Sequence, residues 1–185
     1  MENQRVRLTK KLFKNSLIEL LKESSIYTIS VTELCKKAEL NRSTFYKYYE
    51  NIFDVMADIE YDVINEGGNC IKEINGKNIN DIYKSVNELL LNIKENKDAY
   101  FVIINQENDS EFYKNMLEKV VDFFKYQTAM LNINIKENEN YIYSYIISGS
   151  ASVIKNWINL NCDKPSMEIS KLICDTAYKI LEIKK

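Results

Sequence analysis

The chain has 185 residues, of which 45% are hydrophobic, enough to fill the core of one large domain or of a small domain joined to a medium one. It contains no histidine, which excludes Ser-His-Asp and Cys-His catalytic pairs and every histidine-bearing metal site. It has only four glycines and one proline, too few for phosphate-cradling loops or the tight turns of a β-sandwich, so the composition favours helices.

The cysteine pattern indicates the compartment. Cysteines at positions 35, 70, 162 and 174 are widely separated, form no CxxC motif and follow no secretory signal pattern. We therefore expect reduced, mostly core-facing thiols in a cytoplasmic protein. A structural disulfide, or a redox-sensing thiol at Cys70 or Cys162, is the alternative. The longest uncharged stretch, 140–154, is shorter than the about 20 apolar residues that cross a bilayer, so no membrane span is expected.

Net charge is −2, but the charge is divided unevenly along the chain. Residues 1–50 hold ten basic and six acidic side chains, whereas residues 51–185 hold fifteen basic and twenty-one acidic ones. A basic amino-terminal unit joined to an acidic body is typical of a protein in which only one part approaches phosphate. Ordinary solvated helix faces would give the same pattern.

The amino-terminal part of the chain predicts two helices before residue 40. Apolar residues recur at three- to five-residue steps, which predicts an amphipathic helix over 5–22 with its lysines on the other side. Ser30 and Glu33 have the spacing of a capping box, and the apolar residues that flank them have that of a hydrophobic staple. A second helix is therefore expected to start at Ser30 and to run to about Ala38.

Two asparagines mark further helix starts. Asn41 offers the cap of a short third helix, about 42–49, after a tight corner at Glu39. A two-turn helix, a corner and another short helix form the plan of a helix-turn-helix. Asn51 offers the cap of a longer fourth helix, which the glycine pair at 67–68 is expected to fray.

Every segment beyond residue 78 again has a helical period, and none has the pattern of a strand. The fold class expected from the sequence is therefore all-α. Polar residues 132–140 form a connection, and Pro165 suits the first turn of the last helix. The predicted helices cover residues 79–93, 100–104, 112–124, 140–161 and 165–183.

The short third helix carries the residues with the most specific chemistry. In a helix-turn-helix the second helix enters the major groove of DNA, about 12 Å wide, and presents its first turn to base edges. Phe45 and Tyr49, four residues apart, are expected to pack against Leu34 and its neighbours in the preceding helix. The opposite face carries basic groups that donate to guanine O6 and N7, and hydroxyls that reach bases or phosphates: Arg42, Ser43, Tyr46 and Lys47.

The segment from Ser30 to Tyr49, with its capped helix and its Thr-Phe-Tyr triplet at 44–46, resembles the DNA-binding domain of the TetR/AcrR family of bacterial transcriptional regulators. The resemblance covers roughly residues 8–56. It implies a homodimer of about nine helices per subunit, with a helix-turn-helix domain over 1–50 and a larger effector-binding and dimerisation domain over 51–185. It implies base or groove contacts by Thr32, Arg42, Ser43 and Lys47, and phosphate contacts by Thr44, Tyr46 and Tyr48.

Three positions depart from the family pattern. Glu39 stands where a small residue is usual, which adds strain if a positive φ is needed there. Tyr48 replaces a common histidine or aromatic residue and keeps a hydroxyl. Ile52 replaces a common lysine, so one phosphate contact is missing. We expect lower affinity for DNA with the mode of binding unchanged.

The carboxy-terminal half is less specific. Small residues over 148–152 bear a weak resemblance to the end of a TetR-like branch related to regulators of dihydroxyacetone metabolism. Together with the apolar face of 165–183, they predict a four-helix dimer interface on the order of 1,600 Å² or more. An ordinary intramolecular core is the alternative. The residues assigned to the interface are Tyr145, Gly149, Ser152, Val153, Leu172, Ile173 and Ile180.

Thirteen tyrosines and seven phenylalanines raise the question of an aromatic ligand pocket, although most such residues form cores. The carboxylates of Asp58 and Asp62, four residues apart, are interpreted as a solvated helix surface and not as an acid/base or metal site. The residues placed where an effector cavity would lie are Tyr100, Phe101, Phe123, Phe124, Tyr143 and Trp157.

These features predict a cytoplasmic transcriptional regulator that binds a palindromic operator in double-stranded DNA as a homodimer, with recognition helices about 34 Å apart. An unidentified small-molecule effector would shift it between two arrangements. Repression is expected over activation on family grounds, and no cofactor or metal is expected. The alternatives are a regulator controlled by a protein partner with no small ligand, and a helical enzyme, for which the residue inventory offers no catalytic constellation.

Overall fold

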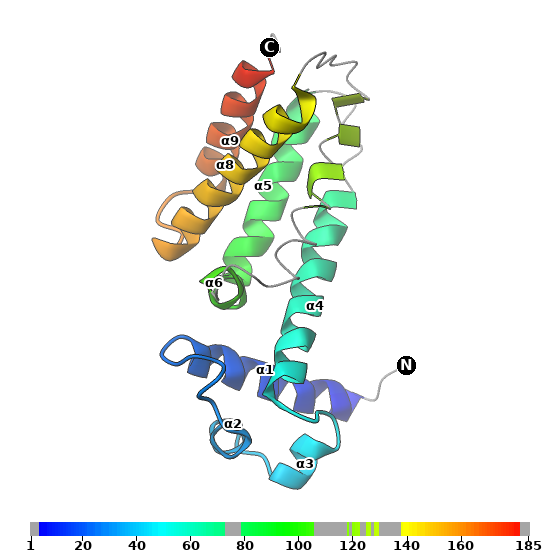
Figure 1. Ribbon diagram of the computed structural model, residues 1–185, viewed down its shortest axis with the longest axis vertical. Coiled ribbons are helices and arrows are strands. Elements are labelled where there is room, and N and C mark those ends of the chain that lie inside the picture. Colours follow the sequence, from blue (N-terminus) through cyan, green and yellow to red (C-terminus); the bar gives the residue numbers. More distant parts are fainter. Residues whose placement is uncertain are drawn as a thin grey trace. The chain divides into compact units, whose positions relative to one another are not determined.

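The structure, a computed structural model, describes residues 4–72, 79–105, isolated positions between 118 and 129, and 138–181 (Figure 1). The side chains of residues 68–72 and 79 are outside the described set. All regular elements of the described residues are α-helices, which confirms the expected fold class. Within the same residues, no helix is both long and apolar enough to span a bilayer.

The chain divides into two compact units, Met1–Val63 and Ile64–Lys185. The first unit therefore includes the first part of the fourth helix, whereas the functional boundary predicted at residue 50, which stays a prediction, excludes it. Its helices are α1 (Gln4–Leu21), α2 (Val31–Lys37), α3 (Arg42–Tyr46) and the first part of α4 (Ile52–Lys72). The helix predicted over 42–49 is thus shorter than expected, because the chain leaves the helix at its cap, Lys47.

The start and the end of α2 follow from local chemistry. The Ser30 Oγ accepts a hydrogen bond from the Glu33 N–H at 3.1 Å, which confirms the predicted cap. At the other end, the Leu40 N–H bonds the Cys35 carbonyl at 3.0 Å and the Glu39 N–H bonds that of Lys36 at 3.3 Å. These two bonds form a Schellman motif, and Glu39 takes the left-handed conformation that the motif requires, with φ 54°.

The two predicted asparagine caps differ in outcome. Asn41 has the extended backbone of a cap, but within the described residues its side chain makes no capping hydrogen bond, so the prediction of a side-chain cap is wrong there. Asn51 does cap α4, since its Oδ1 accepts from the N–H groups of Phe53 at 2.8 Å and Asp54 at 3.2 Å. The Asp54 carboxylate in turn accepts from the backbone N–H groups of Glu50 and Asn51.

Helix α4 continues through Gly67 and Gly68 to Lys72, so the predicted fraying at the glycine pair is wrong. Gly67 is buried, and a Cβ placed on it would lie only 3.1 Å from the Tyr100 hydroxyl oxygen. A glycine inside a helix costs about 1 kcal/mol relative to alanine. The close approach of Tyr100 accounts for a glycine at this helical position.

The second unit consists of the end of α4 and four further named helices. Helix α5 packs against α9, α9 against α8, and α8 against α6 (Figure 1). Ser170 donates to the Tyr83 carbonyl at 2.9 Å, which adds a polar tie between α9 and α5. The helix predicted over 112–124 lies mostly outside the described residues. The helix bounds are α5 (Ile79–Glu95), α6 (Lys97–Asn105), α8 (Glu139–Asn159) and α9 (Ser166–Ile180).

Candidate nucleic-acid interface

One side of the α3 segment, which we define as helix α3 and the residues that follow it up to Tyr49, is anchored by aromatic packing. Phe45 is fully buried and Tyr49, just after α3, is 4% exposed. The Phe45 ring meets the ring of Phe13 edge-on at 5.4 Å, and the Tyr49 ring lies 5.7 Å from Phe45. The burial of this face was predicted, but its contact with the Phe13 ring was not, because Phe13 belongs to α1 and not to the preceding helix.

The other side of α3 faces solvent. Tyr46 is 53% exposed, and Thr44 and Tyr48 are half-buried. Because these side chains are accessible, the geometry is compatible with the DNA contacts predicted for them, which stay predictions. The other exposed members of the predicted set are Arg42, Ser43 and Lys47 of the α3 segment and Thr32 of α2.

The basic groups of α3 lie against aromatic rings. The Arg42 guanidinium donates to the Tyr46 hydroxyl at 3.5 Å and lies 5.9 Å from the centre of that ring. The hydrogen bond to Tyr46 raises the pKa of Arg42, so this group keeps its charge. The Lys47 ammonium lies 5.6 Å from the centre of the Tyr48 ring. Such contacts hold long cationic side chains near one geometry before any ligand arrives.

An open groove of about 610 Å³ lies beside the α3 segment. Its lining mixes basic, acidic and tyrosine side chains, so the exposed face of α3 continues into a concave surface of mixed charge. The residues that line it are Lys10, Tyr46, Lys47, Tyr48, Tyr49, Glu50, Asp54 and Asp58.

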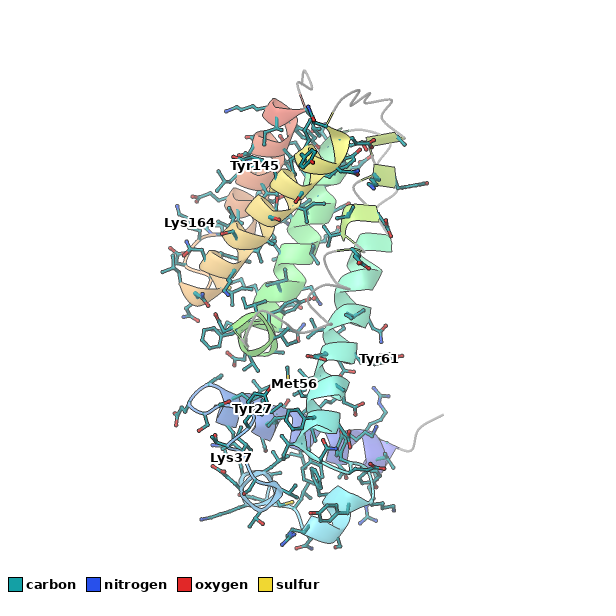
Figure 2. All side chains as sticks on the ribbon, in the orientation of Figure 1. Tyr27, Lys37, Met56, Tyr61, Tyr145 and Lys164 are labelled. Carbon is teal, nitrogen blue, oxygen red and sulfur yellow. The ribbon has the colours of Figure 1, made fainter. Side chains whose placement is uncertain are left out.

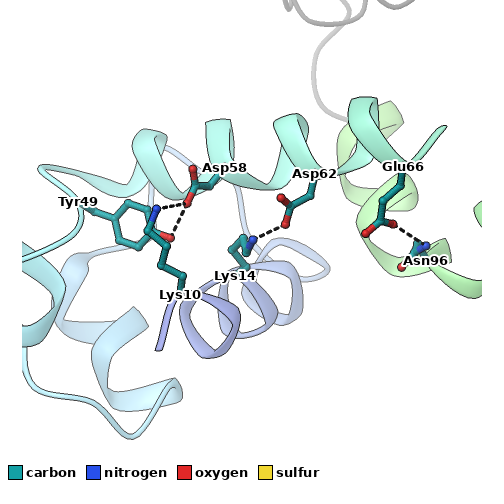
Figure 3. A network of polar contacts seen from close by, with 7 residues as sticks. All are labelled: Lys10, Lys14, Tyr49, Asp58, Asp62, Glu66 and Asn96. Carbon is teal, nitrogen blue, oxygen red and sulfur yellow. Dashed lines mark hydrogen bonds and ion pairs between the residues drawn. The ribbon is translucent and has the colours of Figure 1, made fainter. Parts of the chain in front are cut away.

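The two aspartates of α4 pair with two lysines of α1 (Figure 3). The Lys10 Nζ lies 3.2 Å from the Asp58 Oδ2, and Lys14 pairs with Asp62 one turn further along both helices. The side chains of Asp58 and Asp62 are 33% and 49% exposed, so both keep contact with solvent, but each also pairs with a lysine of α1, which was not predicted. Each pair joins residues 48 positions apart, a relation that periodicity along one helix does not reveal.

The amino-terminal unit as a whole is not basic. The compact unit Met1–Val63 contains ten basic and ten acidic residues, so its net charge is zero. Positive charge available to DNA is therefore local and not a property of the whole unit. Exposed basic side chains of α2 and the α3 segment supply it: Lys36, Lys37, Arg42 and Lys47.

The residues predicted to line an effector pocket belong to the second unit. Tyr100, Tyr143 and Trp157 are buried, Phe101 is half-buried, and positions 123–124 lie outside the described residues. The Trp157 indole donates to the carbonyl of Lys164 at 3.0 Å, and the Tyr143 hydroxyl lies 2.6 Å from the Thr128 Oγ1. These bonds suit an ordinary core as well as a pocket wall, so the pocket stays a prediction.

The predicted dimer interface is largely accessible. Tyr145 of α8, labelled in Figure 2, is 71% exposed. Leu172 of α9 is 52% exposed. No atom lies within 4 Å of a Cβ placed on Gly149, so the surface beside it is open. Ile173, by contrast, is only 9% exposed and offers little area to a partner. Met167, also on α9, is 42% exposed and was not among the predicted residues. Of the remaining residues, Ser152 is exposed and Val153 and Ile180 are half-buried.

The three thiols among the described side chains are buried. Cys35 and Cys162 lie outside any disulfide, and burial raises the pKa of both thiols above the ordinary value of 9.0. A raised thiol pKa disfavours the reactive thiolate. Cys174 is also buried, and the side chain of Cys70 is outside the described residues.

The chain is similar in sequence to known proteins. A TetR-type family model described as "Transcriptional regulator C-terminal region" matches residues 80–179, more than half of the chain. The uncharacterized HTH-type transcriptional regulator YxbF of Bacillus subtilis (strain 168) is 26% identical over an alignment of 159 positions that covers 79% of this chain. The matched region spans 38% of the length of that relative.

Solved structures share the fold. The fatty acid degradation regulator FadR from Bacillus halodurans has a TM-score of 0.73 at 12% identity, covering 96% of both chains. The dihydroxyacetone kinase operon activator DhaS has a TM-score of 0.59 at 17% identity, covering 96% of this chain and 98% of its own. At these identities the likeness concerns the fold alone, so the predicted link to the dihydroxyacetone branch stays a prediction. The chain belongs to the TetR family of transcriptional regulators.

Proposed function

We propose that the chain is a cytoplasmic, homodimeric regulator that binds a palindromic operator through α3 in the major groove. The observation that carries the proposal is the division of the α3 segment. Phe45 and Tyr49 hold one side in the core, whereas Arg42 and Lys47 project from the other side into solvent. A segment with this division presents its exposed groups to base edges while its backbone stays fixed.

The exposed groups have the chemistry that base and phosphate recognition needs. Arg42 and Lys47 donate to O6 and N7 of guanine, and the Ser43 hydroxyl reaches either a base or a phosphate oxygen. The hydroxyls of Thr44, Tyr46 and Tyr48 suit phosphate oxygens. Thr32, exposed at the start of α2, is assigned a contact with a base or with the groove.

Dimerisation through α8 and α9 would set the spacing of the two α3 segments. The exposed Tyr145 and Leu172, with the open surface at Gly149, support a face on which a second copy packs closely. A two-fold axis between the copies would place the recognition helices about 34 Å apart, one turn of DNA. The operator is then expected to be palindromic.

An effector in the second unit would act by its different affinity for the DNA-binding arrangement and for another one. We favour a small molecule and repression as the outcome, on the grounds of the family. The name of the DhaS neighbour, an operon activator, shows that the same fold also serves activation. The DNA site proposed here is the same for either sign of regulation.

The test is selection of DNA by the purified protein. Fragmented genomic DNA is retained by the full chain, and the enriched duplex is then used in mobility shifts. Arg42→Ala and Lys47→Ala should each weaken binding to it by about 1–3 kcal/mol. Lys84→Ala, which removes an exposed charge on α5, serves as the matched control and should bind as the unmodified chain does. Unchanged binding by both α3 variants would contradict the proposal.

A further inference from the structure

We infer that Tyr49, Asp58 and Lys10 form a positioning device for the recognition helix, and that the Tyr49 hydroxyl thereby sets how well the protein discriminates its operator from other DNA. The inference rests on the proposed function and deepens it. It assigns a role to three residues that need not touch a base.

The recognition helix needs such a device because it is short. Helix α3 has five residues, and Phe45 is the buried one among them. Lys47 lies at the helix cap, beyond the last helical residue, so the helix itself does little to fix its direction. The backbone at Lys47 is held between two aromatic anchors, Phe45 before it and Tyr49 after it.

Tyr49 is the anchor on which several elements converge. Its ring lies 6.1 Å from Phe13 of α1 and 5.7 Å from Phe45 of α3. The Lys10 ammonium of α1 lies 5.6 Å from the centre of the same ring. The packing of the Tyr49 ring therefore fixes how deeply the α3 segment is buried, but apolar contacts of this kind still allow the segment to slide or rotate.

The hydroxyl supplies the direction that ring packing lacks. The Tyr49 hydroxyl donates to the Asp58 Oδ2 at 2.9 Å, and the Lys10 Nζ lies 3.2 Å from the same oxygen (Figure 3). Residues from α1, from the end of the α3 segment and from α4 thus meet at one carboxylate oxygen. A hydrogen bond to a carboxylate is stronger and more directional than one between neutral groups.

Loss of that direction should affect base reading more than phosphate binding. Bidentate contacts to guanine require donors to keep hydrogen-bond distances and angles, whereas charge attraction to phosphates tolerates small displacements. Tyr49 is two residues from Lys47, so a shift of its ring carries Lys47 with it. Operator binding should therefore weaken while binding to unrelated DNA stays nearly constant.

The chain offers a matched control on the same two helices. Asp62 pairs with Lys14 one turn from the Asp58 pair, and it also joins α4 to α1. The Tyr49 hydroxyl, however, bonds Asp58 and not Asp62. Removing the Asp62 carboxylate therefore weakens the packing of α1 on α4 without touching the anchor of α3.

The experiment compares the unmodified full chain with Tyr49→Phe, Asp58→Ala, their double variant and Asp62→Ala. The two probes are the duplex that the unmodified chain enriches from genomic DNA and a scrambled duplex of the same length and composition. Dissociation constants are measured below the unfolding transition of each variant, so that folded protein is compared with folded protein. Tyr49→Phe keeps the ring and removes only the hydroxyl, so it is the variant least expected to disturb folding.

Tyr49→Phe should lower the ratio of operator to scrambled affinity about tenfold, the size expected for one hydrogen bond to a charged group. The double variant should lose no more than the larger single loss, because both changes remove the hydrogen bond between the Tyr49 hydroxyl and Asp58. Asp62→Ala should keep the ratio. An unchanged ratio for Tyr49→Phe, or an equal loss for Asp62→Ala, would overturn the inference. If the unmodified chain enriches no duplex, the proposed function itself has failed.

Discussion

Glu39 holds a left-handed backbone at the end of α2, with φ 54°, and its replacement by glycine should stabilise the protein. The residue occupies the position of the Schellman motif where glycine is usual, because a Cβ in this conformation crowds the neighbouring carbonyl oxygen. The Glu39 side chain is exposed, so Glu39→Gly sacrifices no core packing.

The magnitude follows from two opposing effects. The left-handed conformation costs a residue with a Cβ about 1–2 kcal/mol, which glycine avoids. The greater freedom of glycine in the unfolded chain returns about 0.4–1 kcal/mol of that gain. The net increase in the free energy of unfolding should be about 1 kcal/mol. The transition temperature should rise by about 2–4 °C if the whole chain unfolds together, or by about 4–8 °C if the amino-terminal unit unfolds separately.

The assay is urea unfolding followed by circular dichroism, with calorimetry for the transition temperature. Glu39→Ala is the matched control, since it removes the same charge but keeps the Cβ in the left-handed conformation. Glu39→Gly should be more stable than Glu39→Ala by about 1 kcal/mol. Equal stability of the two variants would refute the assignment of strain to this Cβ.

Three further outcomes are expected. Burial raises the pKa of Glu60 in the folded protein above its ordinary 4.5. The free energy of unfolding therefore keeps its full value below pH 4.5, and it falls as pH rises through the raised pKa, because the unfolded chain ionises first. Glu60→Gln should therefore stabilise the protein at pH 7 and give no gain below about pH 4, and urea unfolding at both values checks this. Trp157→Phe removes the N–H that donates to the Lys164 carbonyl and should cost about 1–3 kcal/mol in the same assay; an unchanged midpoint would contradict it. Leu172→Arg should give a folded monomer in sedimentation velocity, whereas a persisting dimer would remove Leu172 from the interface.

Local chemistry explains why part of the fold could be predicted. The Ser30 cap and the reciprocal bonds around Asn51 depend on residues within four positions of one another, so the sequence alone contains them. The division of α3 into a buried and an exposed side follows in the same way from the four-residue spacing of Phe45 and Tyr49.

Contacts between distant segments explain why the rest could not. Periodicity indicates which face of a helix is apolar, but not which other helix covers that face. The sequence therefore did not reveal that Lys10 of α1 lies beside Asp58. Fraying was predicted at Gly67 because the sequence does not show that the Tyr100 side chain lies against this position. In both cases the deciding partner lies tens of residues away along the chain.

The insertion of α3 into the major groove is tested most directly by methylation interference on the enriched duplex. Methylation of guanine N7 blocks a major-groove acceptor and leaves the minor groove unchanged. Two symmetric clusters of interfering guanines are expected, with their centres about 34 Å apart along the DNA. Full binding to DNA methylated at every guanine N7 would contradict the account.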